Sequence, residues 1–301
     1  MSPQKRVLVT CATGNQGQGV VHHCLAAGHS VYAYVRNPNS PAAIQLEKSG
    51  AKLVTGDLDD FEALRLASQG IDTVFHTEVQ TGDWAGDLER SNNVIEAART
   101  SATVSNFILS TAIKTGQHES FPGWGPEHPM RQYWLNKHAL ESRVRDAEYP
   151  HWTIIRLGHF LQNLIFPLSA ITFPGFKNDR VLRVSWRPDT KLPWVDAGDV
   201  GIVAAAAASD PESYTHKEID LATEALTVEQ LGAKLSKALG MDVKVHYLSK
   251  EEVEEMIKGG SPVPAAHQWA NQVPAGDAAG KIKGLSLTSV DQFLAENANL
   301  I

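Results

Sequence analysis

The chain has 301 residues, of which 43% are hydrophobic and 20% charged, a composition typical of a globular protein with a buried core. Its 27 basic and 34 acidic residues give a formal net charge of −7, which argues against a nucleic-acid partner, because such partners need a basic surface. Two cysteines, Cys11 and Cys24, cannot form a disulfide framework, and the longest apolar run, 202–208, is too short to span a membrane. No signal peptide is recognised, so we expect a cytoplasmic protein without a membrane partner.

The first half of the chain alternates β-branched stretches with amphipathic ones. The predicted strands are 5–10, 30–35, 51–54, 72–76, 106–110 and 152–157, and the predicted helices are 20–27, 61–67, 88–99 and 131–148. This alternation predicts an α/β fold with a Rossmann-type doubly wound parallel sheet. Residues 1–157 would form an NAD(P)-binding domain.

The second half has a different pattern, because residues 158–195 are interrupted by proline and glycine. A helix over 196–208 is expected to pack back on the first domain. Further helices are predicted over 227–239 and 249–258, with a strand over 243–248, whereas 261–284 is expected to be surface loop with a short helix. Residues 158–301 would thus form a smaller α+β C-terminal region that mainly binds substrate.

Residues 10–17 lie where a dinucleotide-binding turn would connect the first strand to the first helix. Such a turn needs small residues for its tight bend, for backbone approach to the pyrophosphate and for helix packing. Gly14 and Gly17 suit the second and third tasks, and the helix N-terminus favours phosphate. Cys11 stands at the first position, where glycine is expected, and this predicts some strain in the turn.

The end of the second predicted strand indicates which cofactor is bound. Arg36 follows Gly14 by 22 residues, a position where NAD-dependent enzymes tend to carry an acidic residue against the ribose 2′-hydroxyl. A guanidinium group can instead hold a 2′-phosphate through two hydrogen bonds. The sequence therefore favours NADP(H), and the alternative is an arginine that is merely solvated.

Several stretches make the chain resemble the NmrA-like family of atypical short-chain dehydrogenases/reductases over essentially its whole length. They are VLVTCATGNQGQGVV, YVRNP, GAKLVTGDLDD, HWTIIRLGHFLQNLI and LSLTSVDQFLAEN. The resemblance implies that residues 13–17 bind pyrophosphate, that Arg36 contacts the adenosine phosphate and that Asp57 and Leu58 lie beside adenine. The segment 77–80 would run along the cofactor. The family includes both reductases and redox-sensing regulators.

Tyr133 and Lys137 form the YxxxK pair that short-chain dehydrogenases use, and their spacing places them on one helix face. The tyrosine would exchange a proton with the substrate. The lysine would bind the nicotinamide ribose, and its charge would lower the tyrosine pKa. In the alternative, Lys137 serves the cofactor alone and Tyr133 packs half-buried beside Trp134.

The hydroxyl that completes this machinery in short-chain enzymes follows the fifth strand. In extended members of that group it would fall on Ala112 of this chain. Thr111 or Ser110 could replace it, and Thr111 is the better placed, although both hydroxyls could simply cap the strand end. The predicted catalytic residues are therefore Tyr133, Lys137 and Thr111.

Aromatic residues are concentrated between residues 121 and 194, which hold 10 of the 16 Phe and Trp residues. Several lie in loops expected over the carboxyl ends of the strands, where such sheets bind ligands. This concentration favours an apolar substrate that is aromatic or polycyclic. Alternatively, these aromatic residues belong to the core or cover a homodimer contact. The predicted substrate pocket consists of Phe121, Trp124, Tyr133, His159, Phe160 and Asn163.

The predicted cofactor-binding residues come from the turn, from the strand ends and from the later motifs. They are Thr13, Gly14, Asn15, Gln16, Gly17, Arg36, Asp57, Leu58, Thr77, Val79, Gln80, Lys137, His159 and Phe160. The histidines and cysteines lack metal-ligand spacing, so no metal site is predicted.

Two functions are compatible with these features. The first is an NADPH-dependent reductase or dehydrogenase that acts on a carbonyl or conjugated double bond of a small apolar metabolite, with Tyr133 as proton donor. The second is an NADP(H)-sensing regulator that binds a protein partner and performs no chemistry. An enzyme needs an open cavity over the nicotinamide, and a sensor does not.

Overall fold

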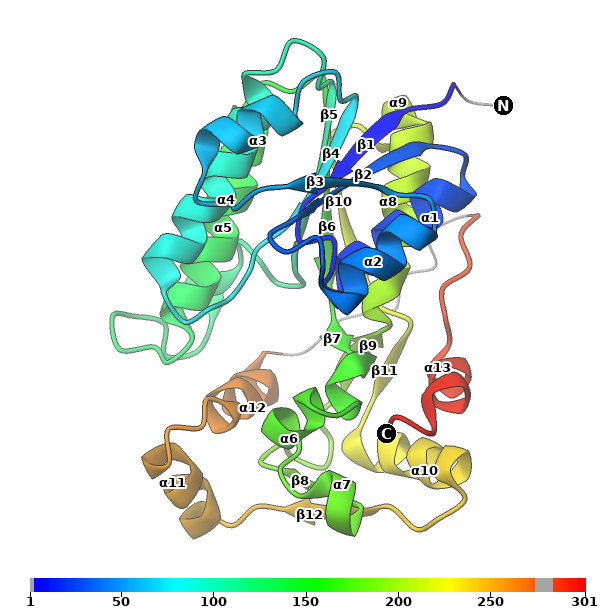
Figure 1. Cartoon of the computed structure of the whole chain (residues 1–301). Helices are drawn as coiled ribbons and strands as arrows, with labels where there is room; N and C mark the ends of the chain where they lie inside the picture. Colours follow the sequence, from blue (N-terminus) through cyan, green and yellow to red (C-terminus); the bar gives the residue numbers. More distant parts are fainter. Residues whose placement is uncertain (1–2, 274–283) are drawn as a thin grey trace. The chain divides into compact units, whose positions relative to one another are not determined.

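The computed structural model describes residues 3–273 and 284–301 (Figure 1). The chain forms two compact units. Unit 1 comprises Met1–Gly116, Gln132–Leu157 and Ala197–Asp220, and unit 2 comprises Gln117–Arg131, Gly158–Asp196 and Leu221–Ile301. Unit 1 thus includes most of the helix over 196–208 that was expected to pack back on the first domain, unit 2 also includes Gln117–Arg131, and the chain crosses between the units five times.

Unit 1 is built on a seven-stranded sheet with the order β10-β6-β5-β4-β1-β2-β3. The pairs from β6 through to β3 are all parallel. The doubly wound α/β architecture predicted from the sequence is therefore confirmed. The strands are β1 (Arg6–Val9), β2 (Ser30–Val35), β3 (Lys52–Thr55), β4 (Thr73–Thr77), β5 (Asn106–Ala112), β6 (His151–Leu157) and β10 (Lys217–Leu221).

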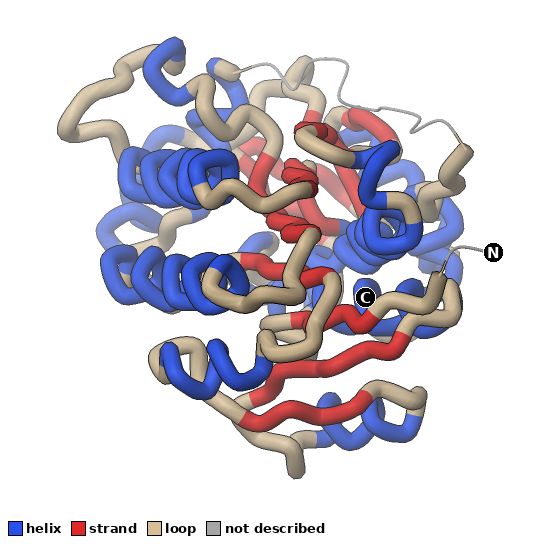
Figure 2. The backbone as a smooth tube through the Cα atoms, turned by 90° about the horizontal axis from the view of Figure 1, so that it is seen from above, coloured by secondary structure: helices blue, strands red, loops and turns tan. Residues whose placement is uncertain are grey.

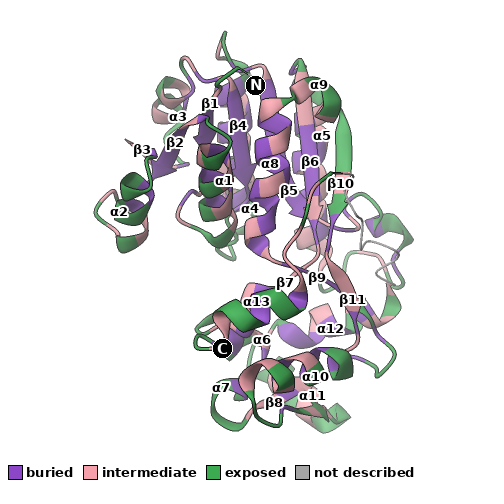
Figure 3. Cartoon of the chain, turned by 90° about the vertical axis from the view of Figure 1, so that its right-hand side faces the viewer, coloured by how far each residue is buried: buried purple, intermediate pink, exposed green. Residues whose placement is uncertain are grey.

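Helices cover both faces of this sheet, with α3, α4 and α5 on one side and α1 and α8 on the other (Figures 1 and 3). Central strands buried on both faces need apolar side chains throughout, which explains the runs of Val, Ile and Phe in β1, β4 and β5. The helices are α1 (Asn15–Ala26), α2 (Pro41–Lys48), α3 (Phe61–Ala67), α4 (Trp84–Arg99), α5 (Arg131–Asp146), α8 (Val200–Ser209) and α9 (Pro211–Tyr214), with a 3-10 turn, η3 (Ala197–Asp199).

Unit 2 has two small sheets and its own core of aliphatic and aromatic side chains, among them Phe176 and Trp194. The first sheet has the order β11-β9-β7 and the second pairs β12 with β8; Figure 2 marks the strands and helices along the chain. The strands are β7 (His159–Phe160), β8 (Val181–Val184), β9 (Leu192–Val195), β11 (Glu224–Leu226) and β12 (Lys244–Tyr247). The helices are η1 (His118–Ser120), η2 (Leu161–Leu164), α6 (Leu168–Thr172), α7 (Phe176–Asp179), α10 (Val228–Leu239), α11 (Lys250–Lys258), α12 (Val263–Gln272) and α13 (Val290–Asn297).

Several elements were missed or begin elsewhere than the sequence suggests. Helix α2 was not predicted, although Ser40 caps it by accepting a hydrogen bond from the Ala43 amide and Pro41 occupies its first turn. Helix α4 begins at Trp84 rather than at residue 88, because Asp83 caps it. The helix expected within 261–284 is α12, and residues 274–283 lie outside the described part of the chain.

The turn that follows β1 contains a residue in the left-handed region of backbone space. Cys11 has a φ of 53°, a conformation that costs most side-chain-bearing residues about 1–2 kcal/mol. Its Sγ donates to the Thr77 carbonyl at 3.2 Å, and burial raises its pKa to about 12, so it remains a thiol. The strain predicted for this position is present.

This conformation predicts how the chain responds to Cys11→Gly and Cys11→Ala. Glycine tolerates a positive φ and alanine does not, so the glycine variant should be the more stable of the two by about 1 kcal/mol. Cys24, buried in α1, is the matched control: there glycine should be the less stable by about 1 kcal/mol. The measurement is the free energy of unfolding in urea. Equal values for the two Cys11 variants would contradict the argument.

Candidate functional site

The turn between β1 and α1 leaves the first amides of the helix without a capping side chain. Gly14 occupies the N-cap position of α1 with extended backbone and, having no side chain, makes no side-chain capping hydrogen bond. The amides of residues 15–17 have no partner within the helix and can bind an anion. A Cβ at Gly17 would lie 2.3 Å from the Cys11 carbonyl oxygen, so the helix begins this close to the turn only with glycine there.

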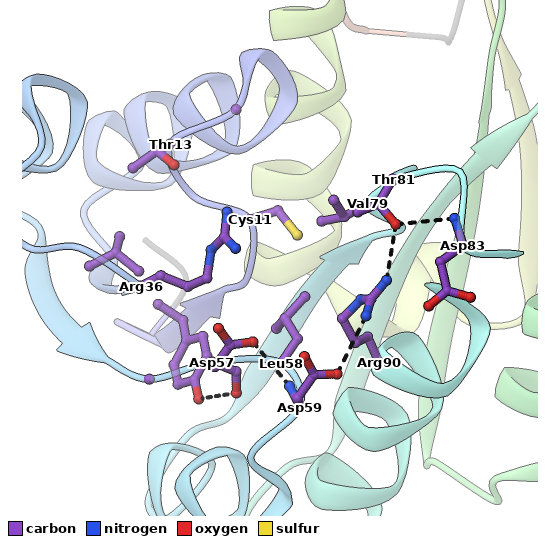
Figure 4. A pocket seen from close by; sticks show the side chains of 14 residues that line it. Cys11, Thr13, Arg36, Asp57, Leu58, Asp59, Val79, Thr81, Asp83 and Arg90 are labelled. Carbon is purple, nitrogen blue, oxygen red and sulfur yellow. Dashed lines mark hydrogen bonds and ion pairs between the residues drawn. The ribbon is translucent and has the colours of Figure 1, made fainter. Parts of the chain in front are cut away.

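A cavity of about 410 Å³ opens beside this turn, and all of its lining belongs to unit 1. Figure 4 shows Thr13 and Cys11 on one side, Asp57 and Leu58 on the opposite side. Such a position outside the carboxyl ends of parallel strands is where doubly wound sheets bind ligands. The lining residues are Cys11, Thr13, Gly14, Tyr34, Val35, Arg36, Gly56, Asp57, Leu58, Asp59, Val79, Thr81, Asp83 and Arg90.

The two arginines of this cavity differ in how their charge is compensated. Arg90 pairs with the buried carboxylate of Asp87 at 2.5 Å and with Asp59 at 3.5 Å, and it also donates to Thr81. Arg36 is exposed and has no carboxylate partner among the described residues; in Figure 4 it extends towards Cys11. Arg36 is therefore the guanidinium with charge available to a ligand.

Six of the residues predicted to bind the cofactor line this cavity, and the others lie elsewhere. Gln16 lies deeper in unit 1, where its side chain donates to Thr77 at 3.2 Å and accepts from Ser110 at 2.6 Å. Gln80 is exposed outside the cavity lining. The six that line the cavity are Thr13, Gly14, Arg36, Asp57, Leu58 and Val79; Asn15 and Gly17 belong to the first turn of α1, and His159 and Phe160 belong to unit 2.

Tyr133 and Lys137 lie one turn apart on α5, with the Lys137 ammonium 5.7 Å from the centre of the Tyr133 ring. The ammonium also pairs with the Glu78 carboxylate at 2.9 Å, and both side chains are buried. Burial raises the pKa of Tyr133, the Lys137 charge opposes this rise and the Glu78 charge adds to it. The Lys137 charge therefore acts in the predicted direction, but burial outweighs it and the pKa of Tyr133 is raised overall.

Thr111 does not fit the role of a substrate-binding hydroxyl, because its hydrogen bond is already made inside unit 1. It is buried on β5 and donates to the Glu141 carboxylate at 2.7 Å. Arg156 donates to both oxygens of the same carboxylate, at 2.8 and 2.6 Å. Ser110 faces the opposite side of the sheet, since successive strand residues alternate, and donates to Gln16.

Five of the six predicted pocket residues belong to unit 2, whereas Tyr133 belongs to unit 1. Phe121 is 5% exposed and packs against Trp269, so it contributes to packing. His159 lies beside Trp194, with ring centres 5.7 Å apart, and burial lowers its pKa to about 4. Its imidazole is thus neutral at neutral pH. The other members in unit 2 are Trp124, Phe160 and Asn163.

The aromatic concentration between residues 121 and 194 is mostly structural. Six of its ten members are buried, and four of these form part of the unit 2 core. Core packing, the alternative to an apolar pocket, therefore accounts for most of the aromatic residues from which that pocket was predicted. The six buried residues are Phe121, Trp134, Phe173, Phe176, Trp186 and Trp194.

Eight residues of the cavity lining were not predicted. Tyr34 and Val35 end β2, and Asp59 follows the predicted Asp57, so these could have been found from the strand ends. Thr81 and Asp83 precede α4, and were missed because that helix was expected to begin later. The remaining three are Cys11, Gly56 and Arg90.

Within residues 3–273 and 284–301, no group of three or more His, Cys, Asp or Glu side chains is arranged to hold a metal ion. Over the same ranges, none of the helices combines the length and apolar character that crossing a membrane requires.

Comparison with known proteins agrees with this architecture. The chain is 27% identical over 256 residues to an NAD(P)H azoreductase of Xenophilus azovorans, which covers 84% of this chain and 80% of the relative. It is 26% identical to the nitrogen metabolite repression protein nmrA of Emericella nidulans, over 86% of this chain and 73% of that one. A Citrobacter sp. triphenylmethane reductase, solved as a complex with NADP(H), superposes with a TM-score of 0.73 at 21% identity, covering 97% and 99% of the two chains. The model of the NmrA-like family matches residues 3–299, and the chain belongs to that family.

Proposed function

We propose that the chain is an NADPH-dependent reductase of a small apolar, aromatic metabolite. The observation that carries the proposal is the cavity of unit 1, in which an uncapped helix N-terminus and the unpaired Arg36 guanidinium face the same space. Both features favour phosphate groups. The relatives of this chain include an NAD(P)H azoreductase and isoflavone reductases, and these support an aromatic substrate.

The residues of the cavity fit the adenosine half of NADPH. The amides of residues 15–17 would hold the pyrophosphate, and Arg36 would hold the 2′-phosphate. Asp57 and Leu58, at the end of β3, would lie beside adenine, with Val79 covering it from the segment after β4. Asp59 lies 3.5 Å from the Arg90 guanidinium, which also pairs with Asp87 at 2.5 Å.

Tyr133 and Lys137 would supply the protein's part of the reduction. Bound NADPH supplies a hydride. The raised pKa of Tyr133 keeps its phenol protonated at neutral pH, which suits a group that gives a proton to the reduced substrate. Lys137 would bind the nicotinamide ribose. Thr111 is not included, because Glu141 already holds its hydrogen bond.

A second candidate function is an NADP(H)-responsive regulator that binds a protein partner. The engaged Thr111 hydroxyl favours it, because short-chain enzymes use a free hydroxyl at the end of the fifth strand. The similarity to a nitrogen metabolite repression protein supports it too. The two candidates share the cofactor and differ in whether turnover occurs.

The variant Arg36→Ala tests the cofactor assignment. It should weaken NADPH binding by roughly ten- to a hundredfold and leave NADH binding nearly unchanged. This loss corresponds to the contribution of one charged hydrogen bond, about 1.5–3 kcal/mol. Titration calorimetry with both nucleotides gives the comparison. Arg65→Ala, which removes a surface arginine of α3 outside the cavity, is the control and should change neither. Equal losses for NADPH and NADH would contradict the proposal.

The variant Tyr133→Phe separates the two candidate functions. It keeps the ring and removes the phenol, so NADPH affinity should hold while turnover falls by about 10²–10⁴-fold. NADPH oxidation is measured against a panel of azo dyes, quinones, enones and aromatic ketones. Tyr32→Phe, on β2, is the matched control. A variant with the turnover of the parent removes the acid role, and a parent that binds NADPH but reduces nothing on the panel favours the regulator.

A further inference from the structure

The segment after β4 presents consecutive side chains to two different places. Val79 lines the cavity, whereas its neighbour Glu78 is buried against α5. There the Glu78 carboxylate pairs with the Lys137 ammonium at 2.9 Å, and the two side chains are 1% and 8% exposed. One short segment thus joins the proposed adenosine site to the proposed proton-transfer group.

Glu78 has little else to compensate its charge. Its second oxygen receives only a long contact of 3.4 Å from the Asn136 amide, which donates more closely to the Trp84 carbonyl at 2.7 Å. A buried carboxylate is stable only beside a cation, and removal of either partner leaves an uncompensated charge. The pair is therefore mutually dependent.

The other titratable groups that face Lys137 carry no charge at neutral pH. His76, on β4, exchanges a hydrogen bond with Thr10 at 2.8 Å, and burial together with the Lys137 charge lowers its pKa to about 3. Tyr133, on α5, is a neutral phenol because its pKa is raised. Among the residues described, Glu78 is consequently the one anion in contact with the Lys137 ammonium.

We infer that Glu78 is a positioning residue for the reaction: it pairs with Lys137 and holds its ammonium beside Tyr133. The inference rests on the proposed function for what this lysine then does. In this inference the buried carboxylate after β4 is the third member of the group, beside Tyr133 and Lys137. The Thr111 hydroxyl on β5 does not take this place, because it donates its hydrogen bond to Glu141.

The first test compares the stability of variants across pH and needs no activity. Glu78→Gln leaves the buried Lys137 ammonium without a carboxylate partner. The free energy of unfolding that this variant loses relative to the parent should therefore shrink as the pH rises and the ammonium releases a proton. Lys137→Met leaves a buried carboxylate, so its loss should shrink as the pH falls. The double variant should lose less than the sum of the single ones, because it leaves neither charge without its partner.

Urea unfolding from about pH 5 to pH 9 gives these differences. Because the Lys137 charge helps to lower the pKa of His76, the slope of Lys137→Met is measured against the double variant, which also lacks that charge. Glu62→Gln, in an exposed pair with Arg65, is the control and should show no such dependence. Opposite slopes for Glu78→Gln and Lys137→Met support the inference. Parallel or flat slopes overturn it, whether or not the chain proves to be a reductase.

The second test measures turnover against pH. In Glu78→Gln, loss of the Lys137 charge makes the phenol a weaker acid, so turnover should fall about tenfold on the alkaline side while the parent remains flat. Glu78→Asp retains the carboxylate and should restore most of the parental profile. A uniform loss at every pH would indicate a merely structural role and would overturn the inference. A parent without turnover would contradict the proposed function, and the stability slopes would then decide on Glu78 alone.

Discussion

The buried charges along one face of α5 are the constraint on which the site depends. Tyr133, Lys137 and Glu141 follow one another at intervals of four residues and therefore share that face. Lys137 pairs with Glu78 after β4, and Glu141 accepts from Thr111 of β5 and from Arg156 of β6. A buried ion is costly unless its partner is in place, so a shift of α5 by one residue would leave both carboxylates uncompensated. The pairs thus determine where α5 lies along the sheet.

The opposite face of the sheet is fixed by backbone contact. A Cβ at Gly19 of α1 would lie 2.4 Å from the Gly198 carbonyl oxygen, and one at Gly201 of α8 would lie 2.2 Å from the Gly19 carbonyl oxygen. The two helices can therefore approach this closely only because both positions are glycine. This contact holds α1 in place, and with it the uncapped amides that face the cavity.

Local patterns predicted the sheet of unit 1, the turn at residues 10–17 and the placement of Arg36 at the cavity. They were predictable because each rests on a recognisable pattern, either strand periodicity or a turn and a strand end at a fixed spacing. Glu78, Arg90 and the partner of Thr111 were not predictable in this way. Their roles depend on Lys137, Asp59 and Glu141, which lie 59, 31 and 30 residues away in the chain and come together only in the folded unit. The aromatic residues were ambiguous for a related reason, since composition does not distinguish a core from a pocket.

The same distinction applies to the chemistry. A tyrosine four residues before a lysine predicts proximity, and proximity is present, but it does not predict the direction in which the tyrosine pKa moves. That direction is set by burial, which outweighs the lysine charge, and by a carboxylate that the motif does not contain. Because that pKa is raised, Tyr133 is a protonated phenol at neutral pH, and the proposed role of proton donor needs this form.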